Sequence, residues 1–251
     1  MLMHPTLQHL RTMKLDGMAQ ALQEQLELNH ARELSFEERL GLLVDRELTT
    51  RDNRSLARRL KNAKLKQHAT LEDLDYKHPR NLDAKLVRSL ASCAWLSEQH
   101  NLIITGPTGV GKTYLACAFA HQACRQGFTA SYNQASRMLQ ELLIAKADGR
   151  YLKLLTQLAK TDLLILDDWG LEKPDAEQRR ILLELLDDRY DKHSTLITSQ
   201  FPTELWYDKL ADPTLVDAIL DRVLHNSYRM ELSGESLRKA KKPLRSSTDL
   251  A

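Results

Sequence analysis

The sequence predicts an α/β fold, a three-layer sandwich with a parallel sheet between helices, preceded by a small all-helical domain and followed by a short helical segment. Two observations support this prediction. From residue 81 onward, short apolar runs alternate with helical patterns, which is typical of parallel strands joined by crossover helices. Residues 4–70 instead repeat leucines at helical spacing and contain no convincing strand. The expected strands are 102–105, 128–132, 163–167, 195–198 and 229–232.

The N-terminal domain is expected to be built from helices joined to the rest by a linker. Ser35 and Glu38 form the capping-box pattern that starts a helix. The expected buried face of that helix consists of Phe36, Leu40, Leu43, Val44 and Leu48. His78-Pro79 breaks the helical pattern. We expect a helical domain over 1–70, a linker over 71–80, a larger domain over 81–245 with a short C-terminal helical lid, and a tail over 246–251.

The composition is that of an ordinary globular protein. The chain has 251 residues, of which 42% are hydrophobic and 28% are charged, and its formal net charge is only +2. The net charge alone therefore does not demand a nucleic-acid partner. The three cysteines form no C-x-x-C pair, which suits a reducing compartment. Because no apolar run approaches the roughly 18 residues that span a bilayer, we expect a cytoplasmic protein without a membrane partner.

Residues 106–113 carry the pattern G-x-x-x-x-G-K-[ST], which is a phosphate-binding loop (P-loop). An apolar strand precedes the loop, and a helical pattern over 114–126 follows it. The glycines allow successive backbone N–H groups to face an anion, Lys112 can reach the β- and γ-phosphates, and the Thr113 hydroxyl can bind Mg²⁺. The nucleotide-binding residues are expected to be Gly106, Pro107, Thr108, Gly109, Val110, Gly111, Lys112 and Thr113.

Two carboxylates follow the apolar run 163–166. The carboxyl end of a buried parallel strand is where ligands bind in α/β sheets. We expect Asp167 to support Mg²⁺ and Asp168 to orient or deprotonate an attacking water. The alternative is a simple Asp-Asp turn after a core strand. Thr198, Ser199 and Gln200 end the next strand, and one of them could contact the γ-phosphate or the water, although a plain strand-to-loop transition is an equal alternative.

A basic stretch runs from residue 46 to residue 66. Its charge is nearly of one sign, so that pairing between residues four apart does not explain it, and the rest of the chain is nearly neutral. Contact with DNA phosphates is the preferred interpretation, and a solvated helix face is the alternative. No aromatic residues interleave the basic ones, which favours duplex DNA held by its backbone. The predicted contacts from this stretch are Arg51, Arg54, Arg58, Arg59, Lys61 and Lys64.

Together these motifs resemble the AAA+ class of P-loop ATPases, and more closely the IstB family of insertion-sequence helper ATPases, which is related to the helicase loader DnaC. The resemblance covers nearly the whole chain. Besides the P-loop, it rests on the segments Asn81-Leu-Asp83, Leu163-Leu-Ile-Leu-Asp-Asp-Trp-Gly170, Thr198-Ser-Gln200, Asp217-Ala-Ile-Leu-Asp-Arg222 and Gly234-Glu-Ser-Leu-Arg238.

The resemblance implies roles for individual residues. Lys112 and Asp168 would be catalytic, although most AAA+ proteins carry a glutamate at the position of Asp168. Gln200 would take the place of the usual sensor asparagine. Arg222 would be an arginine finger that reaches the site of a neighbouring subunit, and Arg238 would be the second sensor arginine. A surface arginine paired with Asp217 or Asp221 is the alternative for Arg222. A second DNA-facing surface is implied at Arg137, Lys146 and Arg150, and the basic tail 239–242 is a weaker candidate.

The function that the resemblance implies is ATP-dependent help in transposition. With ATP and Mg²⁺ the protein would assemble with itself on double-stranded DNA as a ring or spiral, direct a partner transposase of the IstA integrase type, and disassemble on ATP hydrolysis. A DnaC-like helicase loader is the nearest alternative. A P-loop small-molecule kinase and a nucleotide-gated scaffold with negligible hydrolysis are the others.

Overall fold

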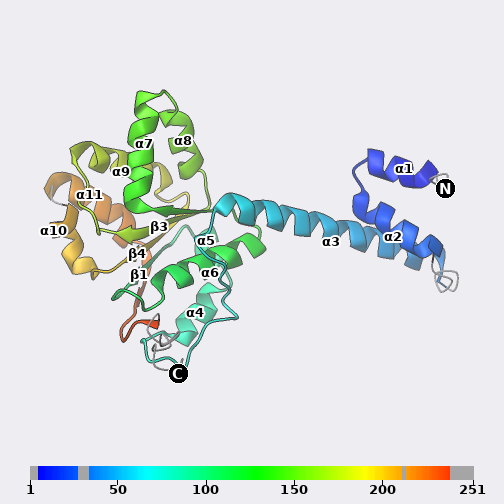
Figure 1. Cartoon of the computed structure of the whole chain (residues 1–251), viewed down its shortest axis with the longest axis horizontal. Helices are drawn as coiled ribbons and strands as arrows, with labels where there is room; N and C mark the ends of the chain where they lie inside the picture. Colours follow the sequence, from blue (N-terminus) through cyan, green and yellow to red (C-terminus); the bar gives the residue numbers. More distant parts are fainter. Residues whose placement is uncertain (1–4, 28–33, 211–212, 238–251) are drawn as a thin grey trace, which may run out of the picture. The chain divides into compact units, whose positions relative to one another are not determined.

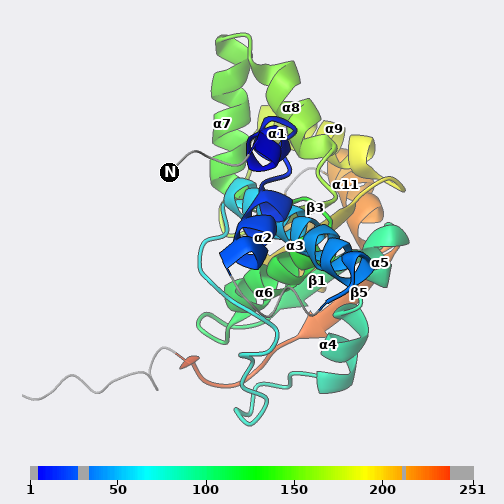
Figure 2. The ribbon, with the colours of Figure 1, turned by 90° about the vertical axis from the view of Figure 1, so that its right-hand side faces the viewer.

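The computed structural model describes residues 5–27, 34–210 and 213–237, and the chain divides into two compact units between residues 59 and 60 (Figure 1). The first unit contains α1 (Pro5–Thr12), α2 (Asp16–Glu27) and most of α3 (Phe36–Ala63). Leu7, Leu10 and Ala19 form its small core. Figures 1 and 2 show α2 lying beside the beginning of α3, with α1 packed against α2.

The contact between α2 and α3 depends on a buried carboxylate. Glu47 of α3 is 5% exposed and accepts hydrogen bonds from the N–H groups of Gly17, at 2.8 Å, and Met18, at 3.1 Å. A Cβ atom at Gly17 would lie 2.8 Å from the backbone of α3, so only glycine allows this approach. The carboxylate thus satisfies donors of the first turn of α2 that no helical carbonyl can reach.

The structure confirms the predicted start of α3 but not its predicted buried face. The Ser35 N–H donates to Glu38 Oε2 at 2.8 Å, and the Glu38 N–H donates to Ser35 Oγ at 3.3 Å, as the capping box requires. However, Phe36 is 76% exposed, and Leu40, Val44 and Leu48 are exposed as well. The prediction of this face was wrong because α2 meets α3 through Glu47 and the close approach at Gly17.

The second unit is built on a five-stranded sheet whose described strand pairs are all parallel. Its strand order is β2-β3-β4-β1-β5, which places β4 between β3 and β1. The strands are β1 (Asn101–Thr105), β2 (Ala130–Gln134), β3 (Leu163–Trp169), β4 (Ser194–Ser199) and β5 (Ser227–Glu231). All the predicted strands are therefore confirmed, with β2 and β5 displaced from the predicted bounds by about two residues.

Helices cover both faces of the sheet, which confirms the three-layer prediction (Figure 1). One face packs against α7 (Ala135–Ala147), α8 (Tyr151–Ala159), α9 (Ala176–Arg189), α10 (Trp206–Leu210) and α11 (Pro213–Leu224) in one apolar core. The other is covered by α6 (Lys112–Arg125), with α4 (Ala84–Leu90) and α5 (Ala94–Ser97) on the same side. The short 3₁₀ turn η2 (Thr203–Leu205) leads into α10. The helices α10 and α11 lie between β4 and β5.

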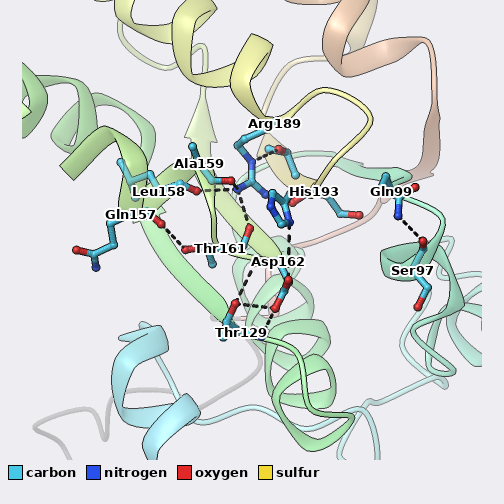
Figure 3. A network of polar contacts seen from close by, with 12 residues as sticks. Ser97, Gln99, Thr129, Gln157, Leu158, Ala159, Thr161, Asp162, Arg189 and His193 are labelled. Carbon is cyan, nitrogen blue, oxygen red and sulfur yellow. Dashed lines mark hydrogen bonds and ion pairs between the residues drawn. The ribbon is translucent and has the colours of Figure 1, made fainter. Parts of the chain in front are cut away.

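A buried arginine joins α8, α9 and β4 at the amino-terminal edge of the sheet (Figure 3). Arg189 is 1% exposed, and its Nη1 donates to the carbonyls of Leu158 at 2.7 Å and Thr161 at 2.7 Å, with Ala159 at 3.1 Å. Its Nε donates to Thr195 Oγ1 at 3.1 Å. These bonds satisfy carbonyls at the end of α8 that have no helical partner. Burial lowers the pKa of Arg189 to about 9, so the guanidinium remains charged at neutral pH.

We expect Arg189→Met to lower the free energy of unfolding of this unit by about 3 kcal/mol, because it leaves several buried carbonyls without a donor. Urea denaturation followed by circular dichroism measures the change. Arg180→Met is the matched control, because Arg180 is an exposed arginine on the same helix and should cost less than about 0.5 kcal/mol. Equal losses in the two variants would contradict the joining role of Arg189.

Candidate nucleotide-binding site

The predicted phosphate-binding loop connects β1 to α6, and its glycines adopt conformations that other residues rarely take. Gly106, Gly109 and Gly111 have φ angles of 143°, 89° and 100°. A Cβ atom at Gly109 would lie 2.1 Å from Ser236 Oγ, and one at Gly106 would lie 2.3 Å from the carbonyl oxygen of Leu232. Both the left-handed backbone and the close contacts therefore require glycine at these positions.

The Lys112 side chain folds back over this loop. Its Nζ donates to the carbonyl oxygens of Gly106 at 2.6 Å and Pro107 at 2.8 Å, and the residue is only 7% exposed. Lys112 is also the first residue of α6, whose N-terminus carries partial positive charge. The ammonium group, the helix terminus and the backbone N–H groups of the loop together form a site suited to an anion.

A cavity of about 500 Å³ opens beside the loop. Its volume lies in the range of pockets that bind small molecules. One wall consists of the loop, Lys112 and Thr113, and the carboxyl ends of β3 and β4 contribute Asp168 and Gln200. The remaining lining residues come from α6, from the segment before α4 and from the chain after β5: Tyr114, Gln67, Asp73, Leu74, Asp75, His78, Arg80 and Leu237.

Asp167 lies at the end of β3 with no exposed surface. Its carboxylate accepts hydrogen bonds from Thr113 Oγ1, 3.0 Å from both oxygens, and from the hydroxyls of Tyr132 and Thr198. Lys66 Nζ lies 3.5 Å from Oδ2. Burial, together with the hydrogen bond to Asp167, raises the pKa of Tyr132, which therefore donates as a neutral phenol. The structure thus brings together Thr113 and Asp167, the two predicted metal ligands.

Asp168 faces a different environment from Asp167 because β3 is irregular there. The pairing of β3 with β4 shifts register between Leu166 and Trp169, and Asp168 takes a φ of 60°. Its N–H donates to Thr198 Oγ1 at 3.2 Å, and its Oδ2 accepts from Gln134 Nε2 at 3.3 Å. As a result, Asp168 lines the cavity, whereas Asp167 does not.

Gln200 also lies against the phosphate-binding loop. Thr108 Oγ1 donates to Gln200 Oε1 at 2.9 Å, which joins the end of β4 to the loop after β1. Gln200 and Asp168 line the same cavity, so the structure brings these two predicted residues together with the loop. The hydroxyl of Ser199, in contrast, donates to the carbonyl of Trp169 and is buried away from the cavity.

The sequence did not indicate Lys66 and Tyr132, which contact Asp167, and it gave no definite role to Arg80, which lies beside the phosphate-binding loop. Lys66 lay within the basic stretch and Tyr132 within a predicted strand, and neither carried a motif. The sequence indicated nothing of Arg80 beyond its place at the end of the expected linker, but it is 2% exposed and its Nη1 donates to the carbonyl of Val110 at 3.2 Å. Burial lowers the pKa of Arg80. Its place directly after Pro79, near the acidic residues of the linker, is the one sequence feature that could have indicated it.

The structure places Arg222 away from the cavity. It lies on α11 at the amino-terminal edge of the sheet, near Asn101 and Thr195, which are at or next to the starts of β1 and β4. Its Nε and Nη1 donate to Asp187 and Asp221, both at 2.8 Å. The pairing with Asp221 is one that sequence reasoning had offered as the alternative. Arg238 and the basic tail lie outside the described residues.

Several of the predicted DNA contacts have carboxylate partners. Arg51 pairs with Glu47 at 2.7 Å and Arg54 with Asp16 at 2.8 Å. Lys146 pairs with Glu177 at 3.0 Å, and Arg150 pairs with Asp148. The pair of Arg51 with Glu47 joins residues four apart within the basic stretch. Four of the predicted DNA contacts are exposed and have no described ion pair: Arg58, Lys61, Lys64 and Arg137. Arg59 is half-buried.

The fold and site define a P-loop nucleotide-binding protein. The sequence profile of the family described as "IstB-like ATP binding protein" matches residues 8–245, and the chain belongs to this family. None of the described helices has the length and apolarity needed to cross a membrane.

The chain is similar to proteins of insertion sequences. It is 48% identical over 239 residues to an insertion sequence ATP-binding protein of Sinorhizobium fredii, covering 95% of this chain and 98% of the relative. It is 52% identical over 204 residues to the ATP-binding protein of insertion sequence IS1162 from Pseudomonas fluorescens, covering 81% and 88%. The crystal structure of DnaI superposes with a TM-score of 0.57 at 22% identity, covering 66% of this chain and 91% of that one, which shows the likeness of the fold.

Two glycine variants test how tightly the loop packs against Arg80. Gly111 and Gly127 share a φ of 100°, but a Cβ atom at Gly111 would lie 2.6 Å from Arg80 Nη1, whereas one at Gly127 would meet nothing within 4 Å. We expect Gly127→Ala to cost about 1 kcal/mol of unfolding free energy from the left-handed backbone alone. Gly111→Ala should cost about 1–3 kcal/mol more, because it displaces a buried hydrogen-bonded guanidinium. Similar values in urea denaturation would show that Arg80 moves aside freely.

Proposed function

We propose that this protein is an ATP-dependent, DNA-binding helper of transposition. With ATP and Mg²⁺ it assembles with itself on duplex DNA and directs a partner transposase, and hydrolysis drives disassembly. The observation that carries this proposal is the separation of Arg222 from the nucleotide cavity across the sheet. If Arg222 acts as a finger from that position, it serves the site of a neighbouring copy, so that hydrolysis depends on assembly.

The side chains of Thr113, at the start of α6, and Asp167, at the end of β3, fit a magnesium–nucleotide complex. A hydroxyl and a carboxylate lie 3.0 Å apart at Thr113 and Asp167, and hard oxygen donors of this kind suit Mg²⁺. When bound, the cation would neutralise charge on the β- and γ-phosphates. Lys112 would leave the loop carbonyls to contact the same phosphates. Lys66 pairs with Asp167 in the structure, and a divalent cation would compete with that pair.

Asp168 is the residue best placed to act on a water molecule. It lines the cavity near the loop, and Gln134 holds its carboxylate. A carboxylate in this position can orient the water and accept its proton. Gln200, which contacts Thr108, would sense the γ-phosphate end of the nucleotide. Asp168 is shorter than the glutamate that most AAA+ proteins carry at its position, and Gln200 is longer than the usual sensor asparagine. We therefore expect slow turnover.

The proposed DNA contacts come from exposed basic side chains on and after α3. Arg58 and Lys61 lie within the helix and Lys64 directly follows it, and all three are exposed. Such groups contact phosphates without reading the bases, which suits a helper that binds many target sequences. The insertion-sequence names of the relatives support transposition over the helicase-loader alternative, because the likeness to DnaI supports the fold alone.

Two substitutions separate nucleotide binding from hydrolysis. We expect Lys112→Ala to abolish binding of a fluorescent ATP analogue, and ATP-dependent DNA binding with it. Arg222→Ala should bind the nucleotide normally but lose about 10³-fold or more in hydrolysis on DNA, since an arginine finger contributes at least that factor. Arg88→Ala, at an exposed arginine of α4, is the control. Normal turnover by Arg222→Ala would refute the finger.

Salt dependence tests the proposed DNA surface. Replacing Arg58, Lys61 and Lys64 by alanine should weaken duplex binding and reduce the slope of log affinity against log salt by about 0.9 for each phosphate contact removed. The matched control replaces the exposed lysines Lys85, Lys153 and Lys160 by alanine. Fluorescence anisotropy with two unrelated duplexes measures both slopes. An unchanged slope in the first variant would remove this surface from the proposal.

A further inference from the structure

The guanidinium of Arg222 is held by three side chains. Its Nε donates to Asp187 Oδ1 and its Nη1 to Asp221 Oδ2, both at 2.8 Å. Its Cζ lies 5.1 Å from the centroid of the Tyr190 ring. Asp221 belongs to the same helix as Arg222, whereas Asp187 lies in the last turn of α9 and Tyr190 directly follows that helix. The contacts therefore connect the arginine to an element packed against its own helix.

This arrangement fixes the direction in which the guanidinium points. A long arginine side chain samples many rotamers, but two hydrogen bonds and an aromatic face define both the position and the plane of the group. The two hydrogen bonds use Nε and Nη1, and no hydrogen bond or ion pair among the described residues uses Nη2. Nη2 therefore remains available as a donor, and the side chain is 32% exposed.

The acidic partners do not prevent a phosphate from approaching. The side chains of Asp187 and Asp221 are 49% and 58% exposed, so water screens their repulsion of an incoming anion. The same exposure means that the ion pairs contribute little to stability. A role in orientation thus accounts for two carboxylates and a ring on one arginine better than a role in folding does.

We propose that Asp187 and Tyr190 are positioning residues that hold the Arg222 finger in the orientation in which it enters the ATP site of a neighbouring copy. This inference rests on the proposed function, because the finger acts only in an assembly. Asp187→Asn keeps the shape of the side chain but removes its charge, and Tyr190→Leu removes the ring.

Steady-state hydrolysis on duplex DNA provides the first test. We expect kcat to fall about 10- to 100-fold in Asp187→Asn, because a misplaced catalytic group loses factors of this size. Its affinity for a fluorescent ATP analogue and its urea midpoint should stay unchanged. Asp188→Asn is the matched control at the adjacent exposed aspartate, and it should behave as the unaltered protein does. A faster rate in Asp187→Asn would overturn the proposal, because the acid would then restrain the finger.

Mixed assemblies show whether Asp187 acts through the finger. Asp168→Asn subunits keep an intact finger but lack the water-activating carboxylate, so they can complete the site of an Asp187→Asn neighbour. An equal mixture of the two should therefore hydrolyse ATP several-fold faster than the mean of the separate proteins. A mixture of Asp187→Asn with Arg222→Ala should show no gain, because neither contributes a working finger.

The reference mixture is Arg222→Ala with Asp168→Asn. Suppose that this reference mixture gains activity but the mixture of Asp187→Asn with Asp168→Asn does not. The positioning role of Asp187 is then refuted, whereas the role of Arg222 as a finger is supported. If neither mixture gains activity, the trans finger itself fails, and the proposed function fails with it.

Discussion

The buried carboxylate of Asp167 is the interaction on which the rest of the site depends. Its oxygens accept hydrogen bonds from Thr113 at the start of α6, Tyr132 of β2 and Thr198 of β4. A carboxylate without exposed surface is tolerated only when such donors surround it. The three donors therefore fix the phosphate-binding loop and the two neighbouring strands relative to the end of β3. The positions of the loop glycines and of Gln200 follow from the same arrangement.

Asp168 is adjacent to Asp167 but faces a different environment because of the register shift in β3. In a regular strand, successive side chains point to opposite faces of the sheet, and neither face is open here. The shift between Leu166 and Trp169 and the positive φ of Asp168 direct its carboxylate to the cavity. One carboxylate is thus enclosed by hydrogen-bond donors. The other lines the cavity, which is where a water-activating group would have to lie.

The sequence predicted features that depend on neighbours along the chain. The loop spacing, the Ser35 capping box and the alternation of strands and helices all belong to this kind, and the structure confirms them. The sequence could not predict contacts between residues far apart along the chain, because no fixed spacing relates such residues. Examples are the contacts of Lys66 with Asp167 and of Arg222 with Asp187. The exposed face at Phe36 was mispredicted for the same reason, since burial depends on which helices pack against α3.

The parallel sheet explains why hydrolysis would require more than one copy. Parallel strands place all their carboxyl ends at one edge, where the loop, Asp168 and Gln200 line the cavity. All their amino ends lie at the other edge, where Arg222 contacts α9. Side-chain motion within one copy cannot bridge the length of a strand, because an arginine reaches only a fraction of that distance. Only a neighbouring copy that presents its amino-terminal edge to the cavity could bring Arg222 to the site, so the proposed finger would make hydrolysis depend on assembly.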